Sequence, residues 1–441
     1  MIDKKKLTKK FINFSYKYKS IIKKCLFFLI IFSSNIPQKN LNYKQIKVAY
    51  YCNSLKNGGV ERVMSLLLNF LSKKKRFDNY LITIERKLEK EYSIPDNIKR
   101  ISLSENKISL FDAIQNNNID ILIYNFYSNS EIKRLNQLNK IKIICYDHSS
   151  YFFWIYNHIY KFKDSVYYQY KKSDIVISLI PLENDYLFKK WGINSILMDN
   201  PSTFEYDLIT PSDLNNKNII MIGRANDHLK RFDLGIKAME YIVNEIPECL
   251  MNILSFYDEK CGTLIKDLKL EKNVRFIGYH KNIETYLKNS SLHILPSISE
   301  AYPMALSETK IFGIPSIIIG LDYLALADKG NIIIFDDNPE SIAKESINIL
   351  KNDNFRKKLG IEARQSLKNR KNELIAKKWV KLILSLYKGK NLYIKKISNF
   401  RKKITENEAK LILKNQLNLL QKRKPFLRNV TLEKLINFSL I

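Results

Sequence analysis

Short runs rich in Val and Ile recur along the chain, and segments with apolar residues at helical spacing separate them. Runs of this length and near-continuous apolarity are typical of parallel strands buried on both faces. A first set lies at residues 46–51, 80–84, 120–125, 141–147, 174–180 and 195–200, and a second at 219–223, 250–256, 274–278, 292–296, 315–320 and 331–335. The polar stretch 202–218 separates the two sets. This alternation predicts an α/β protein with two doubly wound, Rossmann-like domains, each built on its own parallel sheet.

The same pattern sets the expected domain boundaries. A chain of 441 residues is too long for one ordinary hydrophobic core. We expect a first domain at residues 45–203 and a second at 204–390, whose last part, after about residue 340, is purely helical. A basic extension precedes them at 1–44, and a basic helical tail follows at 391–441. Because ligands of open α/β sheets bind outside the carboxyl ends of the strands, the expected site is a cleft that both domains face.

The positive charge of the chain is concentrated at its two ends. Of a formal charge of +30, residues 1–47 carry +11, with twelve Lys and one Asp. Residues 391–441 carry +9, with twelve Lys or Arg and three Glu. Such ends favour anionic lipid, phosphate-rich ligands or nucleic acid, and a merely solvated, lysine-rich composition is the alternative. No aromatic-basic RNA motif or known DNA-binding module is found, so nucleic acid is not an expected partner.

The run CLFFLIIF, residues 25–32, is strongly apolar and follows a long basic segment. It is too short to span a hydrocarbon core, which needs about 20 residues. A signal peptide is one interpretation, although no small-residue cleavage site follows. We favour an interfacial segment, with basic side chains at the headgroups of an anionic membrane and the apolar run at the acyl boundary.

The five cysteines are scattered and form no C-x-x-C pair or Cys/His cluster. This spacing favours reduced, mostly buried thiols in a cytosolic compartment, without a zinc site or a disulfide framework.

The first candidate site is NGGVER, residues 57–62, which follows the first predicted strand. Gly58 and Gly59 allow a tight turn and a close approach of the backbone to a ligand. The helix that follows offers free N–H groups and its positive dipole end to an anion. A simple turn without a ligand explains the same glycine pair.

The second candidate is MIGRANDHLKRFD, residues 221–233, where a strand leads into a helix. Arg224 and Lys230 lie on this connection, and two cations at the carboxyl end of a strand suit a diphosphate leaving group. Arg231 could replace or assist Lys230. Solvated basic side chains are the alternative interpretation.

The third candidate is His148, which lies in YDHSSYFFW at the end of the predicted strand 141–147. A histidine is more often structural than catalytic. Its place at a strand end that should face the cleft makes His148 a candidate site residue.

The fourth candidate is SEAYPMALSE, residues 299–308, in which Glu300 and Glu308 are eight residues apart. Pro303 suits the first position of a helix that ends at Gly313, so Glu300 precedes that helix and Glu308 lies inside it. Free N–H groups around Met304, Ala305 and Leu306 could then hold phosphate oxygens between two carboxylates that bind hydroxyl groups. A nucleotide-sugar has this order of groups: sugar hydroxyls, diphosphate, ribose hydroxyls.

These motifs resemble those of the GT-B glycosyltransferases of family 4, a retaining class. The resemblance spans about residues 45–390 and includes NGGVERV, DHSS, IGRANDHLKRFDLGIKAM, the block from Val274 to Ile317 and the late Trp379. The Glu-x7-Glu block in its strand–loop–helix setting is the specific part, whereas the Gly-Gly turn is not. The resemblance implies the GT-B fold and a retaining hexosyltransferase that acts on a nucleotide-sugar.

The resemblance also implies roles for the carboxylates and the histidine. Glu300 would hold hydroxyl groups of the donor sugar and stabilise its oxocarbenium-like centre. Glu308 would bind the ribose hydroxyls, and His148 would contact the donor sugar near the reacting carbon. The departing phosphate would itself take the proton of the acceptor.

The remaining roles concern the diphosphate. Arg224 and Lys230 would neutralise it in place of a divalent metal, so that neither a metal nor a further cofactor is expected. Gly58 and Gly59 would let the first helix approach the phosphates from the other domain. The implied partners are a nucleotide-sugar, a glycan or lipid-linked acceptor of surface polysaccharide synthesis (capsule or lipopolysaccharide), and the inner face of the plasma membrane, to which a cytoplasmic enzyme would attach peripherally.

The sequence departs from the pattern of many relatives at three places. Ala301 and Tyr302 follow Glu300 where a glycine is common, and Pro303 removes one N–H donor. The stretch NILSFYDE, residues 252–259, lacks the usual Gly-x-Gly. The spacing from Arg224 to Lys230 is one residue longer than in many relatives, so it leaves open whether Lys230 or Arg231 faces the ligand. The alternative functions are those of another GT-B enzyme, such as an epimerase that needs no acceptor, and of a non-enzymatic membrane- or nucleic-acid-binding protein.

Overall fold

The computed structural model describes residues 44–56, 58–125, 128–138, 140–150, 166–224, 227–280 and 282–389, with a few single residues between 405 and 418. The chain divides into two units, residues 1–44 and 45–441, and the fold described below belongs to the second. The predicted interfacial run at 25–32 and most of the predicted tail at 391–441 lie outside the described residues.

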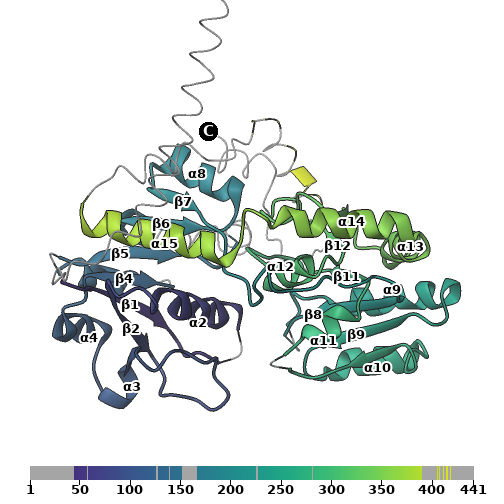
Figure 1. The fold of residues 1–441 in the computed structure, drawn as a ribbon, viewed down its shortest axis with the longest axis horizontal. Coiled ribbons are helices and arrows are strands. Elements are labelled where there is room, and N and C mark those ends of the chain that lie inside the picture. Colours follow the sequence, from purple (N-terminus) through teal and green to yellow (C-terminus); the bar gives the residue numbers. More distant parts are fainter. Residues whose placement is uncertain are drawn as a thin grey trace, which may run out of the picture. The chain divides into compact units, whose positions relative to one another are not determined.

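The first sheet is formed by seven parallel strands of the described residues, in the order β3-β2-β1-β4-β5-β6-β7 (Figure 1). The strands are β1 (Ile46–Cys52), β2 (Phe77–Thr83), β3 (Lys99–Ser102), β4 (Ile121–Tyr124), β5 (Lys142–Tyr146), β6 (Ile175–Ser178) and β7 (Ser195–Leu197). Its connecting helices are α2 (Gly59–Leu71), α3 (Leu103–Asn106), α4 (Leu110–Asn117), α5 (Asn129–Leu135), α7 (Val166–Lys172) and α8 (Pro181–Trp191).

The second sheet has six described strands, also parallel, in the order β10-β9-β8-β11-β12-β13. The strands are β8 (Asn218–Ile222), β9 (Leu250–Leu254), β10 (Val274–Phe276), β11 (Leu292–Leu295), β12 (Ser316–Ile319) and β13 (Asn331–Ile334). The helices that follow β8 are α9 (Phe232–Glu245), α10 (Glu259–Asp267), α11 (Glu284–Lys288), α12 (Met304–Ile311), α13 (Pro339–Lys351), α14 (Asp353–Ser366) and α15 (Asn372–Tyr387).

Each predicted strand run is a strand of the structure, and the two sets form two separate sheets. The edge strand β3 was missed. Its sequence, KRIS, starts with two charged residues, and only Ser102 is buried, so it has no apolar run to recognise. Both strand orders reverse at a switch point, between β1 and β4 and between β8 and β11. At such points the connections leave the sheet in opposite directions, and ligands bind at the carboxyl ends of the strands.

The predicted linker, residues 202–218, contains no helix or strand up to β8, but it is anchored along its length. Arg364 of α14 donates hydrogen bonds to the backbone oxygens of Tyr206 and Ile209, both at 2.8 Å. The backbone N–H of Ser202 donates to Asn372 Oδ1 at 2.7 Å, and Asn372 Nδ2 donates to the oxygen of Ser202 at 3.0 Å. The side chain of Asn372 therefore ties the start of α15 to the start of the linker.

Helix α15 belongs in sequence to the predicted second domain, residues 204–390, but it packs against the first sheet. It contacts α2, and the ring of Trp379 lies 5.2 Å from that of Tyr146 on β5. Trp379 is fully buried. The chain therefore returns to the first sheet after α14, which the helical pattern by itself did not reveal.

Buried cysteines were expected, and the four that the structure describes, Cys52, Cys145, Cys249 and Cys261, are buried free thiols. Burial raises the pKa of each of them, so they are held as neutral thiols. None of the helices in the described part of the chain is both long and apolar enough to cross a bilayer.

Candidate functional site

A pocket of about 850 Å³ gathers residues from the carboxyl ends of both sheets. Nine of the sequence-predicted site residues line it: Gly58, Gly59, His148, Arg224, Lys230, Glu300, Met304, Ala305 and Glu308. Its volume is within the range of small-molecule sites. The strand ends that the topology brings together, after β1, β5, β8 and β11, supply most of these residues. The structure therefore assembles into one site what the sequence shows as four separate motifs.

Helix α2 begins at this pocket. Its N-cap, Gly58, has an extended backbone and makes no side-chain cap hydrogen bond. The carboxylate of Glu61 curls back over it, since a Cβ added to Gly58 would lie 1.8 Å from Glu61 Oε2. No atom lies within 4 Å of a Cβ added to Gly59. Gly58 therefore leaves room for the Glu61 carboxylate at the start of the helix, and Gly59 leaves the backbone open on the side where a Cβ would lie.

Lys230 and Glu300 form an ion pair across the pocket, with Lys230 Nζ 2.6 Å from Glu300 Oε1. Both side chains are largely shielded from solvent, with exposed fractions of 20% and 12%. The hydroxyl of Tyr323 fixes the backbone of Glu300: it accepts from the N–H at 3.2 Å and donates to the carbonyl oxygen at 3.0 Å. A shielded ion pair with fixed geometry is a strong local electrostatic feature, because solvent screens it little.

The structure distinguishes Lys230 from Arg231, which the sequence left open. Arg231 Nη1 lies 2.8 Å from Asp337 Oδ2, and Arg231 is not among the residues that line the pocket. The backbone of Arg231 is left-handed, with φ 51°. Arg224, in contrast, lines the pocket, and its side chain is 69% exposed. Its Nη2 lies 3.1 Å from Asp227 Oδ2.

The first turn of α12 forms another part of the wall. The helix starts at Met304, with Pro303 as its N-cap, so the prediction that Pro303 is the first helical residue is wrong by one position. The reason is the ψ angle of 113° at Pro303, which is extended. Gly313 follows the helix with φ 69°, as expected of a glycine C-terminal to a helix. Met304 and Ala305 line the pocket, whereas the side chain of Leu306 is fully buried in the core.

Glu308, one turn further along α12, is buried and connected to the first sheet's side of the pocket. Its Oε1 accepts a hydrogen bond of 2.5 Å from Thr203 Oγ1, which in turn accepts from Arg62 Nε at 3.0 Å. Burial raises the pKa of Glu308, while Arg62 and the hydrogen bond from Thr203 lower it. Thr203 thus joins α2 and α12 through two side-chain hydrogen bonds.

His148 presents an unused polar atom to the site. Its Nε2 is buried and makes no hydrogen bond, and its ring lies 4.0 Å from that of Tyr146. Burial lowers the pKa of His148 to about 3, so the imidazole is neutral at physiological pH. An orphaned buried nitrogen is costly, which makes Nε2 available to a ligand hydroxyl.

Several pocket residues were not predicted. Glu61 lies inside the motif NGGVER, but nothing in the sequence distinguishes it from an ordinary solvated residue of a helix. Phe256 and Tyr279 stack at the pocket with ring centroids 6.0 Å apart. Tyr92 and Asn200 come from irregular segments. An exposed aromatic run, SFYD, was the one available signal for Phe256.

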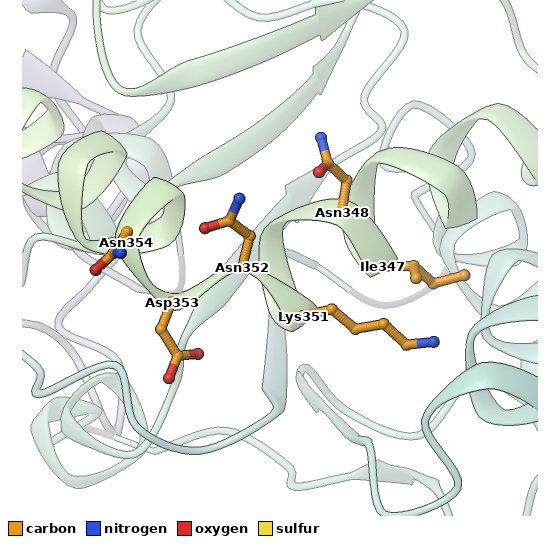
Figure 2. Close-up of a pocket in the computed structure, with 6 residues that line it drawn as sticks. All are labelled: Ile347, Asn348, Lys351, Asn352, Asp353 and Asn354. Atoms are coloured by element: carbon orange, nitrogen blue, oxygen red, sulfur yellow. The ribbon is translucent and has the colours of Figure 1, made fainter.

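A second hollow, of about 620 Å³, lies where α13 gives way to α14 (Figure 2). Figure 2 shows that its six labelled side chains point in different directions and do not converge. Two of its charged residues already form ion pairs. Asp353 Oδ1 lies 2.6 Å from Arg356 Nη2, and Lys351 Nζ lies 2.6 Å from Glu245 Oε2. This hollow contains none of the predicted site residues. Within the described segments there is also no group of three or more His, Cys, Asp and Glu side chains suited to a metal ion.

Part of the chain matches a family model, and curated relatives of low identity match it as well. Residues 204–366 match the family model described as "Glycosyl transferases group 1". The chain is 23% identical over 361 residues to a Campylobacter jejuni protein named GalNAc-alpha-(1->4)-GalNAc-alpha-(1->3)-diNAcBac-PP-undecaprenol alpha-1,4-N-acetyl-D-galactosaminyltransferase, a match that covers 77% of this chain and 98% of that protein. An uncharacterized glycosyltransferase of Haemophilus influenzae is 28% identical over 149 residues, which cover 32% of this chain and 40% of the relative.

Two solved structures show the same fold at lower identity. A glycosyltransferase from Rickettsia africae superposes with a TM-score of 0.60 at 18% identity, covering 77% of this chain and 98% of that one. The Anabaena protein Alr3699/HepE, solved in complex with UDP and glucose, has a TM-score of 0.63 at 12% identity, covering 77% and 100%. The two parallel sheets with their alternating helices therefore form the expected GT-B fold.

Proposed function

We propose that this chain, whose residues 204–366 match the model of the group 1 glycosyl transferases, transfers a sugar from a nucleotide-sugar donor to a glycan or lipid-linked acceptor. The observation that carries the proposal is the pocket in which the Lys230–Glu300 ion pair, the N-terminus of α12 and buried Glu308 occur together. This order of groups matches the sugar, the diphosphate and the ribose of a donor.

In the proposed reaction the protein acts mainly through charge. Lys230 Nζ, already 2.6 Å from Glu300, would lie between that carboxylate and the diphosphate, and Arg224 would approach the phosphates from the pocket edge. Cations aimed at the leaving group stabilise the negative charge that develops there. Glu300 would stabilise positive charge on the sugar ring. Transfer would retain the anomeric configuration, need no metal, and use the departing phosphate as the base for the acceptor.

The relatives support the substrate classes. The name of the Campylobacter relative specifies an acceptor linked to undecaprenol diphosphate, and the Anabaena structure holds UDP and glucose. A lipopolysaccharide outer core galactosyltransferase is also among the structural relatives, at 17% identity and a TM-score of 0.56. We therefore propose surface polysaccharide synthesis, such as capsule or lipopolysaccharide, as the setting of this activity.

Donor and stereochemistry are tested by one experiment. UDP-, GDP- and ADP-sugars are screened by thermal shift, and the stabilising donor is incubated with membrane extract, followed by mass spectrometry and NMR of the product anomer. We expect stabilisation by one nucleotide class and a product with the donor's anomeric configuration. An inverted product would contradict the retaining mechanism, and donor turnover without any acceptor would favour an epimerase-like enzyme.

Membrane attachment is a separate proposal, which rests on the charged chain ends. Residues 1–47 carry +11 and residues 391–441 carry +9, so anionic lipid should attract both. We propose a cytoplasmic enzyme held peripherally at the inner face of the plasma membrane. Removal of residues 1–44 and 391–441 should abolish sedimentation with vesicles that contain anionic lipid, whereas unchanged sedimentation would contradict the proposal. Neutral vesicles serve as the control, since they should bind neither form.

A further inference from the structure

The carboxylate of Glu61 occupies the place where α2 would receive an anion. The N-cap of this helix, Gly58, provides no side chain, and Glu61 Oε2 lies over it, 1.8 Å from where a Cβ would be. The backbone N–H of Glu61 also hydrogen-bonds its own carboxylate, which stabilises the charged form. A carboxylate near a helix N-terminus is favoured by the free N–H groups and the helix dipole. The chain has thus filled this anion position itself.

Glu61 also interacts with Arg224, the exposed cation of the pocket. Arg224 lies close enough to lower the pKa of Glu61, and its Nη2 is 3.1 Å from Asp227 Oδ2. Before any ligand arrives, Arg224 is therefore paired with Asp227 and also attracts the Glu61 carboxylate, which lines the same pocket. The other cation, Lys230, is matched by Glu300 at 2.6 Å. A diphosphate that approaches α2 and Arg224 consequently meets a negative charge already in position, and like charges at such a site repel.

We infer that Glu61 competes with the donor diphosphate for Arg224 and the N-terminus of α2, which weakens nucleotide binding and favours release of the nucleoside diphosphate product. The inference rests on the proposed function, because it takes the ligand to be a nucleotide-sugar. Glu61 would then be a pocket residue that opposes nucleotide binding. Diphosphate binding must displace the Glu61 carboxylate or protonate it.

If diphosphate binding protonates Glu61, the affinity for the nucleotide depends on pH. Burial raises the pKa of Glu61, and a nearby diphosphate would raise it further, so that binding takes up a proton. Lowering the pH neutralises Glu61 and removes the competition.

Other charged or titratable groups that line the pocket or interact with Glu61 come from several elements. Arg62 of α2 is held by Thr203 and lies over the ring of Tyr92, 4.9 Å from its centroid. Cys52 of β1 has its pKa raised by burial, and His148 after β5 has its pKa lowered to about 3, so both stay neutral near pH 7. Lys230 and Glu300 neutralise each other as an ion pair. Burial also raises the pKa of Glu308, so Glu308 could contribute to a pH dependence of binding. A substitution at Glu61 alone separates the contribution of Glu61 from that of Glu308.

The test measures binding of UDP, GDP and ADP by isothermal titration calorimetry to the full-length wild type, Glu61→Gln and Glu89→Gln. The exposed Glu89 does not line the pocket, so the last variant removes the same charge elsewhere. For whichever nucleotide binds, we expect Glu61→Gln to bind about tenfold more tightly near pH 8, the equivalent of about one pKa unit of interaction. This advantage should shrink toward about pH 5, and Glu89→Gln should match the wild type.

Proton uptake on nucleotide binding distinguishes competition by the Glu61 carboxylate from a purely structural role of this residue. The apparent binding enthalpy of the wild type should vary with the ionisation enthalpy of the buffer, and that dependence should decrease in Glu61→Gln. Glu61→Asp keeps the charge and should keep the pH dependence. Equal or weaker nucleotide binding by a folded Glu61→Gln would overturn the inference while leaving the proposed function intact. If the wild type bound none of the three nucleotides, the proposed function would fail and this inference with it.

Discussion

Replacement of Lys230 by alanine is expected to lower kcat/KM for the donor by about a hundred- to a thousandfold, the usual effect of removing one preorganised group that stabilises transition-state charge. Lys230 lines the pocket and its Nζ lies 2.6 Å from Glu300 Oε1, and we propose that it stabilises the leaving diphosphate. Because the substitution also leaves Glu300 shielded and unpaired, part of the loss should come from that carboxylate. Steady-state kinetics with the identified donor measures the effect.

Arg231→Ala provides the matched comparison, since it removes an adjacent positive charge from the same connection. Arg231 is bound to Asp337 at 2.8 Å and does not line the pocket, so we expect a loss of less than about tenfold. Lys230→Arg, which keeps the charge but not the shape, should recover only part of the activity. A larger loss in Arg231→Ala than in Lys230→Ala would reverse this assignment of the two cations.

Replacement of Trp379 by alanine is expected to destabilise the protein by about 3–5 kcal/mol, as for other large aromatic side chains in cores. Trp379 is fully buried in the core, and its ring lies 5.2 Å from that of Tyr146, which is itself 4.0 Å from His148. The cavity would therefore lie beneath a wall of the pocket as well as under α15. Urea denaturation, followed by circular dichroism, measures the free energy of unfolding.

Trp379→Phe is the informative second variant. The indole Nε1 of Trp379 is buried without a hydrogen-bond partner, so phenylalanine removes an unsatisfied donor along with part of the ring. We expect it to cost less than about half as much as alanine. If Trp379→Ala unfolded at the same urea concentration as the wild type, α15 would not be an integral part of the first sheet's core.

Much of the fold could be predicted because parallel strands buried on both faces leave a strong local signal. β1, with the sequence IKVAYYC, and β12, with SIII, are nearly continuous apolar runs. β3 could not be recognised, because an edge strand buries little and KRIS has no such run. The site was predictable to the extent that it consists of strand-to-helix junctions: His148, Arg224, Glu300 and Glu308 lie where the parallel topology brings strand ends together.

Side-chain partners could not be predicted, because they come from distant parts of the chain. Arg231 is held outside the pocket by Asp337, which lies 106 positions away in the sequence. The surroundings of Glu308 depend on Thr203, 105 positions away. Neither relation has a periodicity that a local pattern could reveal.

Two parallel α/β arrays, their order along the chain and the strand-to-helix junctions that line the pocket could be read from local patterns, because strand burial and helix periodicity are local properties of the chain. Tertiary structure decided which cation faces the pocket, that Glu61 fills the N-terminus of α2, and that α15 returns to the first sheet. Those outcomes depend on which side chains meet after folding, since the energy of a buried charge or a buried indole is set by its neighbours in space.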